Sequence, residues 1–358
     1  MDHLLETRFL GQQIWLDNLS RSLIRDGHLA EFIQEHGITG VTTNPAIFQK
    51  AIAAGRYYED DLARLKAEPL DAEARYEQLV IPDVQAACDL LRATWADAKG
   101  EAGYVSLEVS PALAHDEDGT VAAAHRLHAA VARDNVLIKV PATAAGVRAI
   151  ERLIADGISV NVTLMFSLAH VEAVAAAYVR GLETRAAAGQ SVSGIFSVAS
   201  LFLSRVDTLV DGQLDAMTDA ARELRGGTAV AMARLAYQAY RNRFHGEAFA
   251  ALRAQGARPQ YMLWASTGTK NPAYSDLLYV EPLIGPETVN TLPDATLTAL
   301  LDHGRIQHTL ETNVVGAQAQ FAGVAHLGLD MTAIGEELQR AGLAQFESAF
   351  AELLAVTA

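Results

Sequence analysis

Short apolar runs alternate with long amphipathic ones along almost the whole chain, and this alternation constrains the fold more than any other feature. Eight of the apolar runs have the length and composition of strands. They span residues 14–18, 40–44, 104–110, 135–141, 158–165, 192–198, 260–266 and 277–283. Segments of helical periodicity separate many of them, at 20–36, 73–98, 119–132, 143–156, 167–188 and 228–254. In a chain of 358 residues this predicts an α/β fold, a (β/α)8 TIM barrel, with an open doubly wound sheet as the alternative.

Polar residues share one face of several of these strands. In residues 104–110 polar and apolar residues alternate, and Glu108 lies on the polar face of the strand. In residues 158–165 Asn161 and Thr163 share the polar face in the same way. An open sheet covered by helices on both faces offers no reason for this pattern, whereas the inward residues at the C-terminal mouth of a barrel form its active site. The pattern therefore favours the barrel. The expected inward set is Asp17, Asn44, Glu108, Lys139, Asn161 and Thr163, together with Trp264 and Ser266 of the seventh strand.

The chain is expected to form one barrel domain over residues 1–358. A turn with two prolines at 281–286 follows the last strand candidate and is expected to end the regular barrel. Residues 300–358 then carry at least two amphipathic patterns, which predict C-terminal helices that pack on the barrel exterior or across its mouth.

Lys139 is the unusual residue of the fourth strand candidate, Val136-Leu137-Ile138-Lys139-Val140-Pro141. Burying an ammonium is costly, so a buried lysine is usually paired or has its pKa lowered toward the neutral amine, which is a nucleophile. Such an amine can attack a ketone, lose water and form a protonated imine that draws electrons from a neighbouring carbon–carbon bond. Glu108 and Asp17 have the right strand phase to serve as its acid/base groups. A carboxylate pair also fits glycoside hydrolysis or a salt bridge to Lys139.

Two neighbouring loops carry cations that suit an anion. Arg205 stands where the helix after the sixth strand begins, and the loop after the seventh strand offers Ser266 and Lys270 around a glycine. A guanidinium beside helix N-terminal amides binds phosphate, and barrels often hold phosphate in their last loops. Together they predict a phosphate site.

Charge and missing motifs exclude other classes. A net charge of −15 argues against general binding to nucleic acid or to an anionic membrane. One cysteine, Cys88, excludes an intramolecular disulfide, and neither a dinucleotide fingerprint, a P-loop nor HExxH spacing occurs. The first residues lack the pattern of a signal peptide and no long apolar run occurs, so we expect a cytoplasmic protein.

The ordered motifs resemble those of the transaldolases, in the bacterial form of about this length. They are Trp15-Leu16-Asp17, Gly40-Val41-Thr42-Thr43-Asn44-Pro45, Leu107-Glu108-Val109, Leu137 to Pro141, Asn161 to Ser167 and Ser200 to Asp207. The resemblance implies a (β/α)8 barrel without metal or organic cofactor. It also implies transfer of a dihydroxyacetone unit from sedoheptulose 7-phosphate to glyceraldehyde 3-phosphate in the pentose phosphate pathway.

The same resemblance assigns roles to individual residues. Lys139 matches the Schiff-base lysine, Glu108 the acid/base that works through a water held with Thr163, and Asp17 the group that takes the proton of the C4 hydroxyl. Asn44, Asn161, Ser200 and Phe202 match residues around the substrate carbons, and Arg205 matches one phosphate-binding arginine. A second family arginine has no counterpart, and Lys270 is the nearest cation.

Two alternatives stay open at this point. A lysine aldolase that releases free dihydroxyacetone uses the same imine chemistry, and a barrel without catalysis would bind a phosphorylated sugar or a protein. The partners expected for the enzyme are sugar phosphates, in a monomer or homodimer, with no nucleic acid and no membrane.

Overall fold

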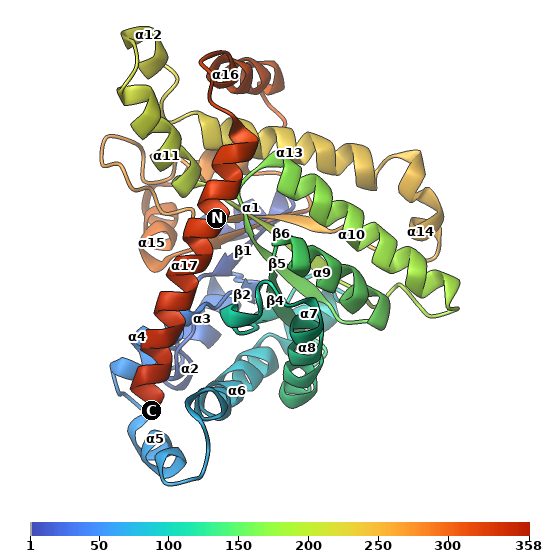
Figure 1. The fold of residues 1–358 in the computed structure, drawn as a ribbon, viewed down its shortest axis with the longest axis vertical. Coiled ribbons are helices and arrows are strands. Elements are labelled where there is room, and N and C mark those ends of the chain that lie inside the picture. The colour runs from blue at the N-terminus through green and yellow to red at the C-terminus, as the bar shows by residue number, and fades with distance from the viewer. Residues whose placement is uncertain (1) are drawn as a thin grey trace.

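Eight parallel strands close into a barrel in the computed structural model, which describes residues 2–358 (Figure 1). Each strand pairs with its neighbours in chain order, and β8 pairs with β1. The strands are β1 (Gln12–Leu16), β2 (Gly40–Val41), β3 (Tyr104–Glu108), β4 (Val136–Pro141), β5 (Val160–Met165), β6 (Ser197–Phe202), β7 (Tyr261–Ala265) and β8 (Thr288–Leu292). The prediction of a (β/α)8 barrel with additional C-terminal helices is confirmed.

Helices fill the connections between the strands and surround the barrel (Figure 1). The helices before β5 are α1 (His3–Phe9), α2 (Arg21–Arg25), α3 (His28–Glu35), α4 (Pro45–Ala53), α5 (Glu59–Lys66), α6 (Ala72–Leu90), α7 (Arg92–Asp97), η1 (Pro111–Leu113), α8 (Glu117–Val131) and α9 (Ala144–Asp156). Those before β8 are α10 (Leu168–Ala187), α11 (Ser204–Asp215), α12 (Asp219–Arg222), α13 (Thr228–Phe244), η2 (Glu247–Phe249), α14 (Ala250–Ala254) and η3 (Glu281–Leu283). After β8 come α15 (Asp294–His303), α16 (Val314–His326) and α17 (Met331–Thr357).

Several of the helices that follow strands begin at a residue whose side chain caps them. Asn44 accepts a hydrogen bond from the amide of Ile47 at the start of α4, and Ser167 accepts one from His170 at the start of α10. Such caps satisfy amides that have no partner inside the helix. The cap therefore fixes where the strand ends and the helix begins at the C-terminal mouth.

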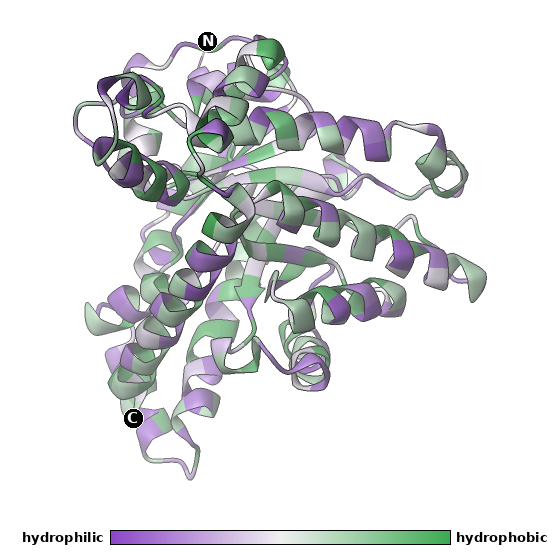
Figure 2. Ribbon diagram, turned by 45° about the horizontal axis from the view of Figure 1, so that its top comes forward, coloured by the Kyte–Doolittle hydropathy of each residue, from purple (hydrophilic) through white to green (hydrophobic). Residues whose placement is uncertain are grey.

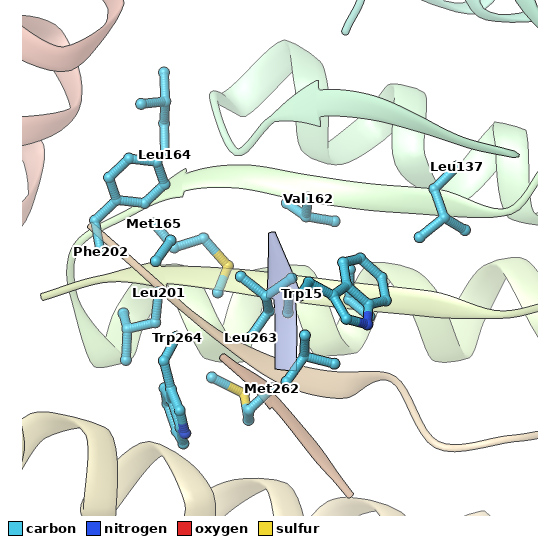
Figure 3. Close-up of a cluster of buried hydrophobic side chains, with 14 of the residues drawn as sticks. Trp15, Leu137, Val162, Leu164, Met165, Leu201, Phe202, Met262, Leu263 and Trp264 are labelled. Carbon is cyan, nitrogen blue, oxygen red and sulfur yellow. The ribbon is translucent and has the colours of Figure 1, made fainter. Parts of the chain in front are cut away.

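The core lies inside the barrel and between the barrel and its helices. The central strands are largely apolar, whereas the helices alternate between polar and apolar residues along their length (Figure 2). Trp15, Leu137 and Leu263 are completely buried, as are Val162 and Trp264 (Figure 3). Within residues 2–358, no helix is both long enough and apolar enough to cross a membrane.

The eighth strand is β8, and the predicted strand at 277–283 is wrong. Those residues form a turn that leads into η3, and the strand follows the two prolines. The segment is apolar because Leu277, Tyr279 and Val280 are buried in the protein core. β8 itself was missed because it contains polar residues. These residues can be buried because they have partners inside the protein; the side-chain amide of Asn290, for example, donates to the carbonyl of Tyr279.

The sixth strand lies further along the chain than predicted, at β6 and not at 192–198. Ser200 and Phe202 therefore belong to the strand itself, and α11 begins two residues after it. The predicted phase of β7 is also wrong. Leu263 and Ala265 face the barrel mouth, whereas the indole of Trp264 points away from it and donates to the carbonyl of Leu283 (Figure 3).

Candidate active site

A cavity of about 410 Å³ opens at the C-terminal ends of the strands. Nine of the eleven residues singled out from the sequence line it: Asp17, Asn44, Lys139, Thr163, Ser200, Phe202, Arg205, Ser266 and Lys270. The other two, Glu108 and Asn161, do not line it and lie on strands next to Lys139. The strand register places both beside Lys139, because Glu108 on β3 pairs with Lys139 on β4, and Lys139 pairs with Asn161 on β5.

Lys139 is buried, with 5 % of its surface exposed. Its Nζ donates to the carbonyl of Thr43 at 3.0 Å and lies 3.7 Å from Oε2 of Glu108, which is longer than a hydrogen bond. The ring of Phe346 faces the same nitrogen, with 5.7 Å between Nζ and the ring centroid. The amine is therefore enclosed by a carbonyl, a carboxyl group and an aromatic ring.

Burial raises the pKa of Glu108 to about 7, although the nearby charge of Lys139 opposes the shift. The side chain is only 7 % exposed, and water can do little to stabilise its ionised form. A carboxyl group with this pKa can both give and take protons near neutral pH. Glu108 is therefore suited to acid/base work beside the amine.

Burial also raises the pKa of Asp17, while the charge of Lys139 and a hydrogen bond from Thr42 oppose the shift. Thr42 donates to Oδ1 of Asp17 at 2.8 Å, and its own oxygen lies 2.6 Å from the hydroxyl of Thr291. Because the proton of Thr42 goes to Asp17, Thr291 donates to Thr42. This chain of hydroxyls fixes the orientation of the Asp17 carboxyl group.

Two buried oxygens on either side of Lys139 lack hydrogen-bond partners among the residues that the structure describes. They are Oε2 of Glu108 and Oγ1 of Thr163. Buried polar atoms are usually hydrogen-bonded, and such exceptions are common where a water or ligand binds. The two oxygens therefore mark a place for a bound molecule next to the amine.

Asn161 does not line the cavity and is fully buried. Its amide nitrogen donates to Ser106 Oγ at 2.9 Å, and its oxygen accepts from Ser200 Oγ at 2.8 Å. One N–H of Asn161 is left over after these bonds. Asn44 likewise uses its oxygen as the helix cap and keeps its NH₂ group for the cavity.

Arg205 lines the cavity as the second residue of α11, and no carboxylate pairs with it anywhere in residues 2–358. Burial lowers the pKa of Arg205, and its guanidinium lies 5.7 Å from the ring centroid of Phe202. A partly buried cation without a counter-ion is costly unless a ligand supplies the charge. Lys270 and Ser266 line the same cavity, and the hydroxyl of Ser266 lies 2.8 Å from that of Ser204, the residue before Arg205, which makes this part of the cavity suited to an anion.

Several cavity residues were not assigned to the site from the sequence. Thr291 was missed because the eighth strand was misplaced; the β-branched run at 288–292 is the signal that would have identified it. Lys50 lines the cavity from α4 and Phe346 from α17, and neither carries a motif. Within the described chain, no three or more His, Cys, Asp or Glu residues gather in a way that could hold a metal ion.

A parallel eight-stranded barrel with a buried lysine and two carboxyl groups at its C-terminal mouth defines a (β/α)8 enzyme, because enzymes of this fold carry their active sites at that end. Comparison with known proteins narrows the class. A profile of the transaldolase/fructose-6-phosphate aldolase family matches residues 14–357. The chain therefore belongs to this family and is an enzyme of the transaldolase type.

Individual relatives agree with the family match over nearly their full lengths. A transaldolase of Thiobacillus denitrificans is 58 % identical over 347 residues, which cover 97 % of each chain. A transaldolase of Neisseria gonorrhoeae is 53 % identical over 355 residues and 99 % of each chain. Transaldolase 1 of Streptomyces coelicolor is 48 % identical, covering 96 % of this chain and 91 % of its own.

Proposed function

We propose that this enzyme transfers a dihydroxyacetone unit from sedoheptulose 7-phosphate to glyceraldehyde 3-phosphate, through a Schiff base on Lys139. The products are erythrose 4-phosphate and fructose 6-phosphate, as in the pentose phosphate pathway. The observation that carries the proposal is the placement of a buried amine near both Glu108 and Asp17, at a cavity that also holds an arginine without a carboxylate partner in residues 2–358. The amine supplies the nucleophile, and the arginine a phosphate site.

The first step is attack of the neutral Lys139 amine on the ketone carbon of the donor. Glu108 is the group placed to take the proton from the ammonium, since its Oε2 lies 3.7 Å from Nζ. A water between Glu108 and Thr163 then relays protons as the carbinolamine loses water and becomes the imine. The unpartnered oxygens of these two residues support this position for the water.

Cleavage of the carbon–carbon bond follows from the protonated imine. Asp17 removes the proton of the C4 hydroxyl, the bond between C3 and C4 breaks, and its electron pair moves toward the imine nitrogen. The aldose phosphate leaves with C4 as its aldehyde carbon, and a three-carbon enamine stays on Lys139. The carbon of this enamine then attacks the acceptor aldehyde, whose oxygen takes up the proton from Asp17. One water adds to the resulting imine, so that fructose 6-phosphate leaves and the amine of Lys139 is regenerated.

The remaining cavity residues are proposed to hold the sugar phosphate. Asn44 and Ser200 bind hydroxyl groups of the donor, and Asn161, which does not line the cavity, contributes through the N–H that its bonds to Ser106 and Ser200 leave over. Phe202 packs beside the dihydroxyacetone end. Arg205, Ser266 and Lys270 bind the phosphate. We further propose that residues 1–358 act as one domain, with 300–358 as C-terminal helices, in a cytoplasmic enzyme without nucleic-acid partners.

Borohydride trapping tests the proposal directly. Incubation with fructose 6-phosphate and borohydride should reduce the imine and leave a stable three-carbon adduct on Lys139, detectable by peptide mass. A folded enzyme without an adduct on this lysine would contradict the Schiff base. Measuring free dihydroxyacetone with and without erythrose 4-phosphate separates a transferase from an aldolase, which the family description also includes.

Arg205→Ala is expected to raise KM for phosphorylated donors by about 10- to 100-fold, because a hydrogen-bonded charge pair contributes about 1.5 to 3 kcal/mol. Lys270→Ala should have a smaller effect, since this lysine is exposed and makes a point contact. Steady-state kinetics with fructose 6-phosphate and with unphosphorylated fructose provide the comparison. Only Arg205→Ala and Lys270→Ala are expected to lose discrimination between the two sugars. Arg305→Ala, at an exposed position, serves as the control and should keep it.

A further inference from the structure

The C-terminal helix α17 runs alongside the barrel and reaches its mouth (Figure 1). One buried side chain of this helix, that of Gln339, forms hydrogen bonds to the ends of two strands. Its amide nitrogen donates to the carbonyl of Ala142 at 2.9 Å and to that of Leu164 at 3.0 Å. Ala142 follows β4, which carries Lys139, and Leu164 follows Thr163 in β5. The helix is therefore fixed directly to the strands of the active site.

Small residues allow α17 to approach this closely. A Cβ on Gly335 would lie 2.6 Å from Cβ of Ser167, and one on Gly342 would lie 3.1 Å from Cδ2 of Leu164. Leu164 itself has a φ of +59°, in the region that non-glycine residues rarely adopt, where the pairing of β5 with β6 shifts its register. Gln339 binds the carbonyl of this residue, so the helix and the irregular strand end hold each other in place.

Phe346 lies seven residues further along α17, two turns beyond Gln339 and on the same side of the helix. It lines the cavity, and its ring centroid is 5.7 Å from Nζ of Lys139. Since Gln339 fixes the helix, it also fixes the backbone of Phe346 relative to the strand that carries Lys139. An apolar wall thus covers one side of the reacting nitrogen.

We infer that Phe346 is a specificity-determining residue that keeps water away from the three-carbon intermediate on Lys139. The inference rests on the proposed function. In transfer, the enamine carbon forms a bond to the carbonyl carbon of the acceptor, and the acceptor oxygen takes the proton from Asp17. In the competing route, a water gives its proton to the same carbon, and the hydroxide left behind adds to the resulting iminium. The carbinolamine then collapses, dihydroxyacetone leaves and the amine of Lys139 is regenerated. Both routes end when an imine on Lys139 is hydrolysed, and they differ in whether the enamine carbon meets the acceptor or a water first. Excluding water from the enamine on the side of Phe346 therefore favours the first route.

The test measures the ratio of free dihydroxyacetone to transfer product, with fructose 6-phosphate as donor and erythrose 4-phosphate as acceptor. Phe346→Ala removes the wall, and the ratio is expected to rise about tenfold. Phe346→Leu keeps an apolar wall and should stay within about twofold of the parent enzyme. Phe9→Ala is the control, because Phe9 is 88 % exposed on α1. If the alanine variant does not fold, Phe346→Val opens a smaller gap and should raise the ratio about threefold.

An unchanged ratio in a folded Phe346→Ala enzyme would overturn the inference, as would an equal rise in Phe346→Leu. Borohydride trapping of the parent enzyme separates this failure from failure of the proposed function. An adduct on Lys139 together with an unchanged ratio overturns only the role of Phe346. A parent enzyme that neither forms the adduct nor transfers the three-carbon unit overturns both.

Discussion

Replacing Lys139 by methionine is expected to lower turnover by on the order of 10⁴-fold or more, because Lys139 is the proposed site of the covalent intermediate and the other cavity lysines, Lys50 and Lys270, are exposed. The barrel should stay folded, since methionine has a similar length and the site is almost fully buried. Stopped assays for product formation, borohydride trapping and thermal unfolding of the same preparation give the three measurements.

Lys66→Met is the matched control for this prediction, because Lys66 is exposed on α5. It should leave both turnover and trapping unchanged. A folded Lys139→Met enzyme that kept turnover within tenfold of the parent enzyme would rule out the Schiff base. It would instead favour a mechanism in which Glu108 and Asp17 act without the amine.

Glu108→Gln is expected to lower kcat by about 10² to 10⁴, the usual contribution of a positioned acid/base group. It should also remove a limb of the pH profile. With a pKa of about 7, Glu108 loses its base form as the pH falls, so the activity of the parent enzyme should drop below neutral pH. A profile of kcat between pH 5.5 and 8.5, measured for both enzymes, is the readout, with the exposed Glu247→Gln as control. The same acidic limb in Glu108→Gln would assign it to another group.

The same substitution makes a prediction for stability. The folded-state pKa of Glu108 is raised from the ordinary value of 4.5 to about 7, so the fold favours the protonated form. This stabilisation is complete below about pH 4.5 and is lost as the pH rises through about 7. Glutamine does not titrate, so Glu108→Gln should gain stability relative to the parent enzyme over this window, by roughly 3 kcal/mol at pH 8. Urea unfolding at pH 5 and pH 8 gives the comparison, and a gap that does not widen with pH would contradict the raised pKa.

Strand phase was a reliable guide for β3, β4 and β5, although not for β7. Glu108, Lys139 and Asn161 were expected to face inward together, and the register pairs them on β3, β4 and β5. This works because side chains alternate strictly along a strand, so one polar face identifies the mouth. Asp17 comes directly after the end of β1, and Asn44 lies beyond the end of β2. Both residues still line the cavity.

The strand predictions were wrong where an apolar segment is not a strand, or where a strand is not apolar. Residues 277–283 are apolar because they are buried in a loop, and β8 carries polar residues because their partners lie inside the protein. At β7, Ser266 reaches the cavity through a φ of +54° and not through strand alternation. Phe346 could not be found from any local pattern, since its contact with Lys139 depends on how two segments far apart in sequence pack.

The position of α17 in the chain has a consequence for synthesis. This helix follows all eight strands, so a growing polypeptide contains Lys139 and both carboxyl groups long before it contains Gln339 and Phe346. A nascent barrel can hold the reactive amine while one side of its mouth is still open to water. Translation therefore supplies the groups around Lys139 before it supplies the helix that covers one side of them.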